Sequence, residues 1–314
     1  MEGKTVIKVE NLVKRYKELV ALDHFNLEVK EGEVFGLLGP NGSGKSTTMN
    51  CILGLLKYDK GNIEVFGKKM APDSYEVKAM IGVVPQEVAV FEELTVLENV
   101  DYFCGLYVND KATRKQYVEE ALEFVGLQEF KKFYPKKLSG GLLRRLNIAC
   151  GIAHKPKLIF LDEPTVAVDP QSRNKILEGI EQLNAEGATI VYTSHYMEEV
   201  EQICTRIAIM DGGKNLAIGT NEELKNMIKT GETIQVEILD FPQAQLESIR
   251  ALPHVYRAEY EENHLKVHYT KGQRNLVRLL DYLKEHDITF GRVYSELPTL
   301  NDVFLEITGK ELRD

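Results

Sequence analysis

Gly39-Pro40-Asn41-Gly42-Ser43-Gly44-Lys45-Ser46 decides the fold of this chain. The stretch follows a short apolar run, Glu33 to Leu38, that predicts a buried strand, and it precedes a predicted helix over Ser46 to Gly54. The stretch fits the pattern G-x-x-x-x-G-K-[ST], in which glycines let backbone N–H groups close around a phosphate. Lys45 can neutralise phosphate oxygens, and the Ser46 hydroxyl can ligate Mg²⁺. A plain glycine-rich turn would not require this strand and helix, so the sequence predicts a nucleotide-binding α/β domain.

A second candidate phosphate-binding turn, Leu138-Ser139-Gly140-Gly141, opens a predicted helix from Gly141 to Ala153. Helix N-termini bind anions through unpaired N–H groups and the positive end of the helix dipole. Six basic residues and no acidic residue lie between Phe130 and Asn147. They form either a solvated face or a positive field around a turn that meets a polyphosphate. The chain thus has two phosphate-binding turns, and the second lacks acids of its own.

Acidic residues follow a second buried strand, Leu158 to Leu161, as the pair Asp162-Glu163. The carboxyl ends of parallel strands are where ligands bind in open α/β sheets. Asp162 is suited to Mg²⁺, and Glu163 can take a proton from an attacking water. An adjacent Asp-Glu pair is usually surface charge, but a pair that ends a buried strand indicates a catalytic site.

Three more side chains are candidates because of the strands that they follow. Gln86 comes after the strand Ile81 to Pro85 and could bridge Mg²⁺ and the attacking water, or could be a solvated loop residue. His195 follows the strand Ile190 to Thr193 and could hold a γ-phosphate. Tyr16 could stack on a base, although a tyrosine near a strand end is more often a packing residue.

The order of predicted elements indicates two domains in a chain of 314 residues. Strands alternate with helices up to about residue 225, which predicts a largely parallel sheet with helices on both faces, with a helical segment at about 88–155. From Gly231 the predicted order is βαββαβ, which fits a ferredoxin-like domain or another α+β sandwich. A terminal helix is expected at Thr299 to Ile307, and the linker lies within Thr220 to Thr230. We therefore expect domains at 4–225 and 231–314.

Composition narrows the possible functions. A formal net charge of −9 argues against general nucleic-acid binding. No apolar run approaches the ~18–20 residues that cross a bilayer. Four widely spaced cysteines fit a reduced, cytosolic chain. A role at a membrane would therefore require a partner.

The motifs occur in a fixed order that resembles the nucleotide-binding subunit of ATP-binding-cassette (ABC) transporters over about residues 4–225. In that family the segments are the aromatic A-loop, Walker A, Q-loop, signature, Walker B, D-loop and H-loop, and the signature is the specific one. The resemblance implies ATP and Mg²⁺ as cofactors, Glu163 as general base, His195 as γ-phosphate sensor and Gln86 as a third catalytic residue. The metal ligands implied are Ser46, Gln86 and Asp162. The nucleotide-binding residues implied are Tyr16, Gly39, Pro40, Asn41, Gly42, Ser43, Gly44, Lys45, Ser46, Thr47, Ser139, Gly140, Gly141 and Asp169.

The resemblance also implies partners. Two cassettes would pair head to tail, as a homodimer, with ATP between one Walker A and the partner's signature. The pair would drive a separate multi-spanning membrane subunit at the cytoplasmic face of the cell membrane, without nucleic acid. The tail from Leu297 to Leu305 resembles daunorubicin-resistance ATPases, a branch that exports drugs, antibiotics or lipid-like molecules. The alternative is a soluble ABC ATPase acting on ribosomes or DNA; a GTPase is a third reading, without an Asn-Lys-x-Asp motif to favour it.

Two residues depart from the family pattern. Leu142 stands where many members have glutamine, so one side-chain hydrogen bond to nucleotide is lost. Ala167 stands where glycine is usual. If the backbone at residue 167 requires a positive φ or a close approach across the dimer, the methyl group lowers stability or the rate of hydrolysis.

Overall fold

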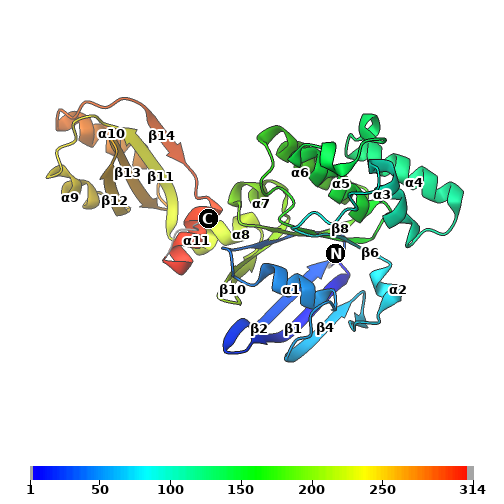
Figure 1. Ribbon diagram of the computed structural model, residues 1–314. Helices are drawn as coiled ribbons and strands as arrows, with labels where there is room; N and C mark the ends of the chain where they lie inside the picture. The colour runs from blue at the N-terminus through cyan, green and yellow to red at the C-terminus, as the bar shows by residue number, and fades with distance from the viewer. Residues whose placement is uncertain (1–2, 310–314) are drawn as a thin grey trace. The chain divides into compact units, whose positions relative to one another are not determined.

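The computed structural model describes residues 3–309. The chain divides into two compact units, with the boundary between Thr220 and Asn221 (Figure 1). Residues 310–314 of the expected second domain lie outside the described residues. Each unit has its own hydrophobic core.

A six-stranded sheet forms the centre of the first unit, in the order β10-β9-β3-β8-β7-β6. Its strands are parallel except for β10, which is antiparallel to β9. The strands are β3 (Val34–Leu38), β6 (Ile81–Val84), β7 (Leu158–Asp162), β8 (Thr189–Ser194), β9 (Arg206–Asp211) and β10 (Lys214–Gly219). Every residue of β3, β7 and β8 is buried, which explains the apolar runs within them. The predicted α/β fold is confirmed.

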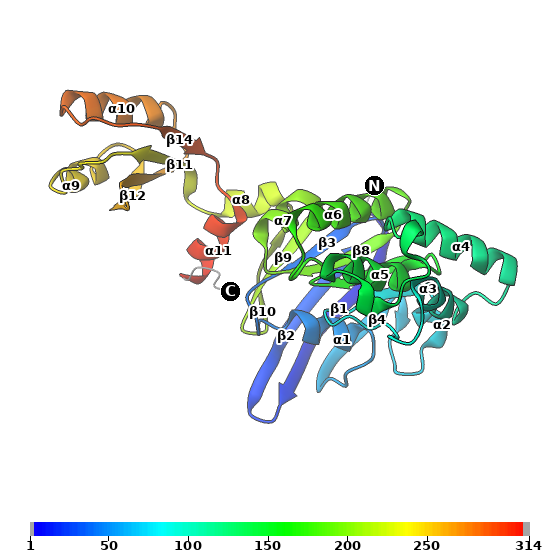
Figure 2. The same cartoon turned by 45° about the horizontal axis from the view of Figure 1, so that its top comes forward.

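A second sheet, antiparallel and in the order β2-β1-β4-β5, lies beside α1 (Lys45–Ile52) (Figure 2). Its strands are β1 (Thr5–Tyr16), β2 (Leu19–Lys30), β4 (Lys60–Val65) and β5 (Lys68–Lys69). The hairpin of β1 and β2 reaches Tyr16, which pairs with Leu19 across a two-residue turn. Residues of both sheets, among them Phe25 of β2 and Phe35 of β3, share one core with Met49 of α1.

Three helices that pack on one another form the predicted helical segment: α3 (Val96–Gly105), α4 (Lys111–Phe124) and α5 (Gly140–Ile152). The other helices of the unit are α2 (Tyr75–Lys78), α6 (Pro170–Ala185) and α7 (Met197–Ile203). α4 begins at Lys111 because Asp110 caps it, accepting a hydrogen bond of 2.8 Å from the Thr113 N–H. Single 3₁₀ turns occur at Gln128–Phe130 and Pro135–Lys137.

The second unit is an antiparallel sheet in the order β12-β13-β11-β14, which is the strand order of a split βαβ, ferredoxin-like arrangement. Its elements are α8 (Asn221–Met227), β11 (Thr230–Glu237), α9 (Gln245–Arg250), β12 (Val255–Glu261), β13 (His264–Thr270), α10 (Asn275–Glu285), β14 (Val293–Glu296) and α11 (Leu300–Thr308). α8 occupies residues for which the sequence predicts a linker. It is helical because Leu224 is buried and the helix packs against α11.

Candidate active site

The glycine-rich loop connects β3 to α1 and is shaped by close backbone approaches. Gly44 has a φ of 107°, and a Cβ built on Gly39 would lie 2.3 Å from the Met210 carbonyl oxygen. Only glycine fits such positions. Gly44 also provides no side-chain cap, so the first turn of α1 keeps N–H groups for an anion.

Lys45 is folded over this loop. Its ammonium donates to the carbonyl oxygens of Gly39 at 2.7 Å and Pro40 at 3.2 Å, and it lies 3.3 Å from Glu163 Oε1. Burial lowers the pKa of Lys45, while the Glu163 carboxylate opposes that shift. The loop therefore holds a positive charge next to the carboxyl end of β7.

Asp162 is the last residue of β7 and lies beside the start of α1. Its Oδ1 accepts from the Thr193 hydroxyl at 2.6 Å and from the Ser46 hydroxyl at 3.2 Å. Mg²⁺ is usually held by one or two carboxylates, water and substrate phosphates, and prefers such hard oxygen ligands. Asp162 and Ser46 thus fit one side of a magnesium site.

Glu163 brings together side chains from three separate strand ends. Its Oε2 lies 3.4 Å from Gln86 Nε2 and 3.3 Å from His195 Nδ1, while its Oε1 faces Lys45. Its backbone has a φ of +46°, which is uncommon for a residue with a side chain. The N–H of Glu163 donates to the Thr193 hydroxyl at 3.0 Å, which helps to hold this conformation. The cluster can bind phosphate, hold a metal and accept a proton at one sheet edge.

The second turn has its contacts elsewhere in the fold. Ser139 caps α5, its hydroxyl accepting from the Leu142 N–H at 3.3 Å, and both Ser139 and Gly140 are exposed. A Cβ on Gly141 would lie 2.6 Å from Ser172 Oγ and 3.1 Å from Asp169 Oδ2. The structure therefore places Ser139 to Gly141 beside the N-terminus of α6, which Asp169 caps by accepting from the Ser172 N–H at 3.0 Å. This hydrogen bond lowers the pKa of Asp169.

Tyr16 ends β1 and is 45% exposed, with Lys14 Nζ 4.8 Å from its ring centroid. An exposed ring can stack on a base. Arg144 does not contribute to a positive surface field, because it is buried and donates to the carbonyl oxygens of Gln86 at 2.7 Å and Pro85 at 3.2 Å. The basic stretch is thus partly structural.

Two polar residues that the sequence analysis did not single out contact the cluster or its neighbours. The Thr193 hydroxyl donates a hydrogen bond to Asp162 Oδ1 and accepts one from the Glu163 N–H. Glu199 is buried in the first turn of α7. A threonine that ends an apolar strand just before Ser194-His195 was the available signal for the first; only the fold reveals the second.

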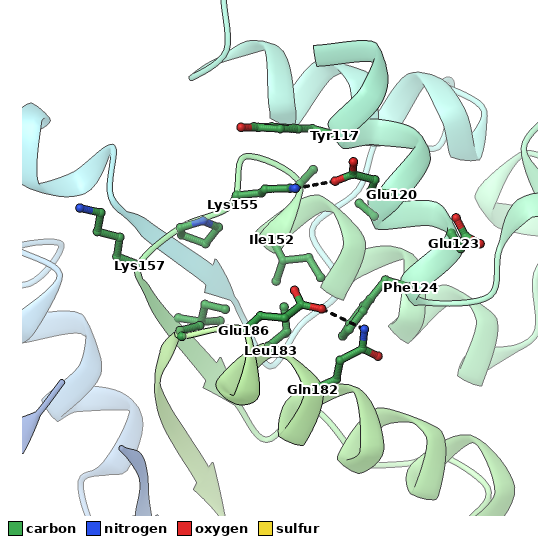
Figure 3. Close-up of a pocket in the computed structure, with 16 residues that line it drawn as sticks. Tyr117, Glu120, Glu123, Phe124, Ile152, Lys155, Lys157, Gln182, Leu183 and Glu186 are labelled. Carbon is green, nitrogen blue, oxygen red and sulfur yellow. Dashed lines mark hydrogen bonds and ion pairs between the residues drawn. The ribbon is translucent and has the colours of Figure 1, made fainter. Parts of the chain in front are cut away.

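A groove of about 610 Å³ lies between α4 and the C-terminal ends of α5 and α6 (Figure 3). Its side chains interact mainly with one another, through a Lys155–Glu120 ion pair at 2.5 Å and a Gln182–Glu186 hydrogen bond at 3.0 Å. Predicted site residues are absent from its lining. The groove is therefore separate from the cluster around Glu163.

A lysine wrapped by a glycine-rich loop, with paired carboxylates at parallel strand ends, defines a nucleotide-binding site of the phosphate-loop class. Residues 22–166 match the family model for ABC transporters, and residues 219–308 match that for the C-terminal domain of DrrA1-3-like ATP-binding proteins. The chain is 41% identical over 311 residues to the linearmycin resistance ATP-binding protein LnrL of Bacillus subtilis (strain 168), covering 98% of this chain and 100% of that protein. The chain belongs to the ABC transporter family and is the ATP-hydrolysing subunit of such a transporter.

Other relatives agree with this assignment. The daunorubicin resistance ATP-binding protein DrrA3 of Streptomyces coeruleorubidus is 33% identical, over 98% of both chains. A solved dimeric, post-hydrolysis structure of the ATP-binding cassette MJ0796, bound to ADP and Pi, has a TM-score of 0.63 at 31% identity, and covers 68% of this chain and 98% of that one. The resemblance to antibiotic-resistance ATPases is confirmed. Within residues 3–309, no helix has the length and apolar character that a membrane span requires.

Proposed function

We propose that this ATPase works as a head-to-tail dimer that drives export through a separate membrane subunit. The observation that carries the proposal is the exposed turn at Ser139 and Gly140, which stands at the head of α5 beside Asp169 and Ser172. The pair Asp162-Glu163 instead lies beside Ser46 and Lys45. A phosphate-binding turn without this pair is half of a site, and a second cassette would supply the other half.

In this proposal the residues around Glu163 perform hydrolysis. Lys45 and the loop N–H groups neutralise the phosphates. Ser46, Asp162 and Gln86 would hold Mg²⁺, which would supply positive charge against the phosphates. Glu163 accepts a proton from the attacking water, and His195 holds the γ-phosphate. Ser139 and Gly140 of the second cassette would close the site, and Tyr16 would stack on the base.

The contact with a membrane subunit is proposed at an aromatic cluster that follows Gln86 in the chain. Phe91, 42% exposed, lies 4.9 Å from Tyr102 and 5.8 Å from Phe103 between ring centroids, and Tyr102 is 47% exposed. Exposed apolar clusters often mark interaction sites. Because Phe91 is five residues beyond Gln86, movement at the nucleotide could reach this surface directly.

The names of the relatives support a proposal for the class of cargo. Proteins named for linearmycin and daunorubicin resistance match along nearly the whole chain. We propose export of a drug, antibiotic or lipid-like molecule, with this chain attached to the cytoplasmic face of the membrane through the membrane subunit.

The experiment that tests the dimer and the hydrolytic role is Glu163→Gln in the full-length chain. We expect the ATPase rate to fall by about 100-fold or more and MgATP to trap a dimer, seen by light scattering. Gly140→Trp in the same background should prevent the trapped dimer while each monomer still binds ATP. A Glu163→Gln variant that stays monomeric at saturating MgATP would contradict the proposal.

The proposed membrane partner is tested by co-expression with each multi-spanning protein that a neighbouring gene encodes. Phe91→Ser with Tyr102→Ser should abolish co-purification and leave the ATPase rate of the isolated chain unchanged. Tyr75→Ser is the matched control, since Tyr75 is 74% exposed on α2, apart from the cluster. Stimulation of hydrolysis by ribosomes or DNA would instead favour the soluble alternative.

A further inference from the structure

A buried carboxylate outside the proposed catalytic set lies just behind it. Glu199, in the first turn of α7, is 3% exposed. Its Oε2 accepts from the hydroxyls of Thr165 at 2.8 Å, Tyr192 at 2.6 Å and Ser194 at 3.1 Å. A buried charge is costly unless it is paired and hydrogen-bonded. The three hydroxyl donors on one oxygen therefore indicate a carboxylate held in a fixed position.

The second oxygen of this carboxylate faces a cation from another helix. Arg173 Nε, in α6, lies 3.3 Å from Glu199 Oε1. The Arg173 guanidinium also lies over the ring of Tyr196, 4.9 Å from its centroid. Burial and the Glu199 carboxylate raise the pKa of Tyr192, so its hydroxyl remains a donor. The carboxylate is therefore held from β8, α6 and the loop that follows β7.

Two of these partners are neighbours of the proposed catalytic side chains. Thr165 is two residues after Glu163, in the turn where the Val166 N–H donates to the Glu163 carbonyl at 3.3 Å. Ser194 immediately precedes His195, and its hydroxyl also accepts from the Tyr196 N–H at 2.9 Å. One carboxylate thus joins the turn that presents Glu163 to the turn that presents His195.

The backbone of Glu163 needs such support. Its φ of +46° is unfavourable for a residue with a side chain and persists only where the surroundings determine it. On the N-terminal side, the Glu163 N–H is held by the Thr193 hydroxyl at 3.0 Å. On the C-terminal side, the hydrogen bond of Thr165 to Glu199 holds the turn.

We propose that Glu199 is a positioning residue that fixes Glu163 and His195 relative to each other, so that it acts on hydrolysis and not on ATP binding. Through Arg173 the same carboxylate is attached to α6, whose N-terminus Asp169 caps. The proposal rests on the roles of Glu163 and His195 given under the proposed function. It requires neither the membrane subunit nor a particular cargo.

The test compares Glu199→Gln with Glu198→Gln in the full-length chain. Glu198 is the matched control because it is the preceding residue of α7 and is exposed. For Glu199→Gln we expect kcat to fall about tenfold or more, since a small displacement of a catalytic group is costly. KM and the ATP Kd should change by less than about twofold, because ground-state binding is retained. Glu198→Gln should match the parent in every parameter.

A double-mutant cycle separates positioning from an independent effect. In a Glu163→Gln background, adding Glu199→Gln should lower the residual rate by a smaller factor than in the parent, because one of the two side chains that Glu199 positions is already inactive. Hydrogen exchange of the amides from Glu163 to Val168 should accelerate in Glu199→Gln and not in Glu198→Gln. Thr165→Val removes one donor while Arg173 still pairs the charge, and it gives a smaller fall in kcat.

Three results would overturn the inference. They are an unchanged kcat in folded Glu199→Gln, a change confined to KM, or a fall in kcat that is as large in the Glu163→Gln background as in the parent. If Glu199→Gln does not fold, Thr165→Val decides, and an unchanged kcat for that variant overturns it. Full turnover by Glu163→Gln would overturn both this inference and the proposed hydrolytic roles. Failure to bind a membrane subunit would contradict only the export proposal.

Discussion

Lys45 and Glu163 form a buried ion pair that joins the glycine-rich loop to the carboxyl end of β7. Lys45 Nζ lies 3.3 Å from Glu163 Oε1, and the two side chains are 4% and 5% exposed. Breaking a buried pair by removing one partner leaves an uncompensated charge, which is often worse than replacing both partners. The pair therefore links the stability of this chain to its proposed catalytic carboxylate.

We expect Glu163→Ala to destabilise the chain by about 2–4 kcal/mol, because Lys45 would keep only its two carbonyl partners. Glu163→Gln should cost less, since the amide oxygen still accepts from the ammonium. Urea unfolding of both variants measures the difference. Glu93→Ala, at an exposed acidic position, is the control. A free energy of unfolding for Glu163→Ala equal to that of the parent would show that the ion pair contributes nothing to stability.

The two glycines of the second turn should respond differently to alanine. A Cβ on Gly140 meets no atom within 4 Å, so Gly140→Ala should keep or slightly raise stability in the helix, by about 0.5 kcal/mol. A Cβ on Gly141 would lie 2.6 Å from Ser172 Oγ and 3.0 Å from Ser172 Cβ, so Gly141→Ala should separate α5 from α6 and destabilise the chain. Thermal unfolding measures both effects.

Hydrolysis provides the second readout for Gly140→Ala. If Gly140 faces the nucleotide of a second cassette, the added methyl group lowers the ATPase rate of a fully stable protein. The ATP affinity of the monomer should not change, because Lys45 and its loop are untouched. Full ATPase activity in Gly140→Ala would argue against a close approach at this turn.

Ala167 adopts the left-handed conformation that the sequence analysis considered, with a φ of +58°. We expect Ala167→Gly to raise the ATPase rate, because the loop between Glu163 and Asp169 loses a strained residue. Its stability should be unchanged or up to about 1 kcal/mol higher, since relief of strain offsets the greater freedom of glycine in the unfolded chain.

The matched control is Ala112→Gly, at an exposed position in α4, which should lose about 0.5–1 kcal/mol. Steady-state phosphate release and thermal unfolding compare the two variants. Ala167→Gly with unchanged hydrolysis would mean that the methyl group does not limit turnover.

The second unit should lose stability below neutral pH through His268. Burial lowers the pKa of His268 below its ordinary value of about 6.5, although Glu259, 3.7 Å from Nε2, opposes the shift. Because the unfolded chain then binds more protons than the folded chain, stability falls as the pH drops below about 6.5, and levels off below the folded pKa. Arg257 also faces His268 and disfavours its protonation.

Hydrogen exchange of the Ile234 and Val267 amides in the full-length chain, corrected for the intrinsic rate, follows this loss. His268→Gln should remove most of the pH dependence of their protection. His286→Gln, at an exposed histidine of the same unit, should leave it intact. An equal decline in the parent and in His268→Gln would assign the effect to another group.

The sequence alone determined the family, the α/β class and the nucleotide chemistry, because these depend on short contiguous motifs. The loop from Gly39 to Ser46 and the pair Asp162-Glu163 can be recognised without knowing any tertiary contact. Each follows a run of apolar residues that indicates a buried strand, β3 or β7. The split βαβ order of the second unit was likewise readable from alternating strands and one amphipathic helix. The pairing of β1 with β2 to Tyr16 was not, because polar residues face outward in an antiparallel hairpin.

Only the tertiary structure decided which side chains meet. Glu199, Thr165 and Ser194 come together because β7 and β8 are parallel neighbours whose carboxyl ends share one edge of the sheet. Arg144 became an internal donor to Gln86 because α5 packs against the end of β6. The local sequence determines secondary-structure propensity and contains the motifs. Hydrogen bonds between residues far apart in the chain depend instead on strand order and register. The φ values of Glu163 and Ala167 are likewise imposed by those contacts, against the local preference of both residues.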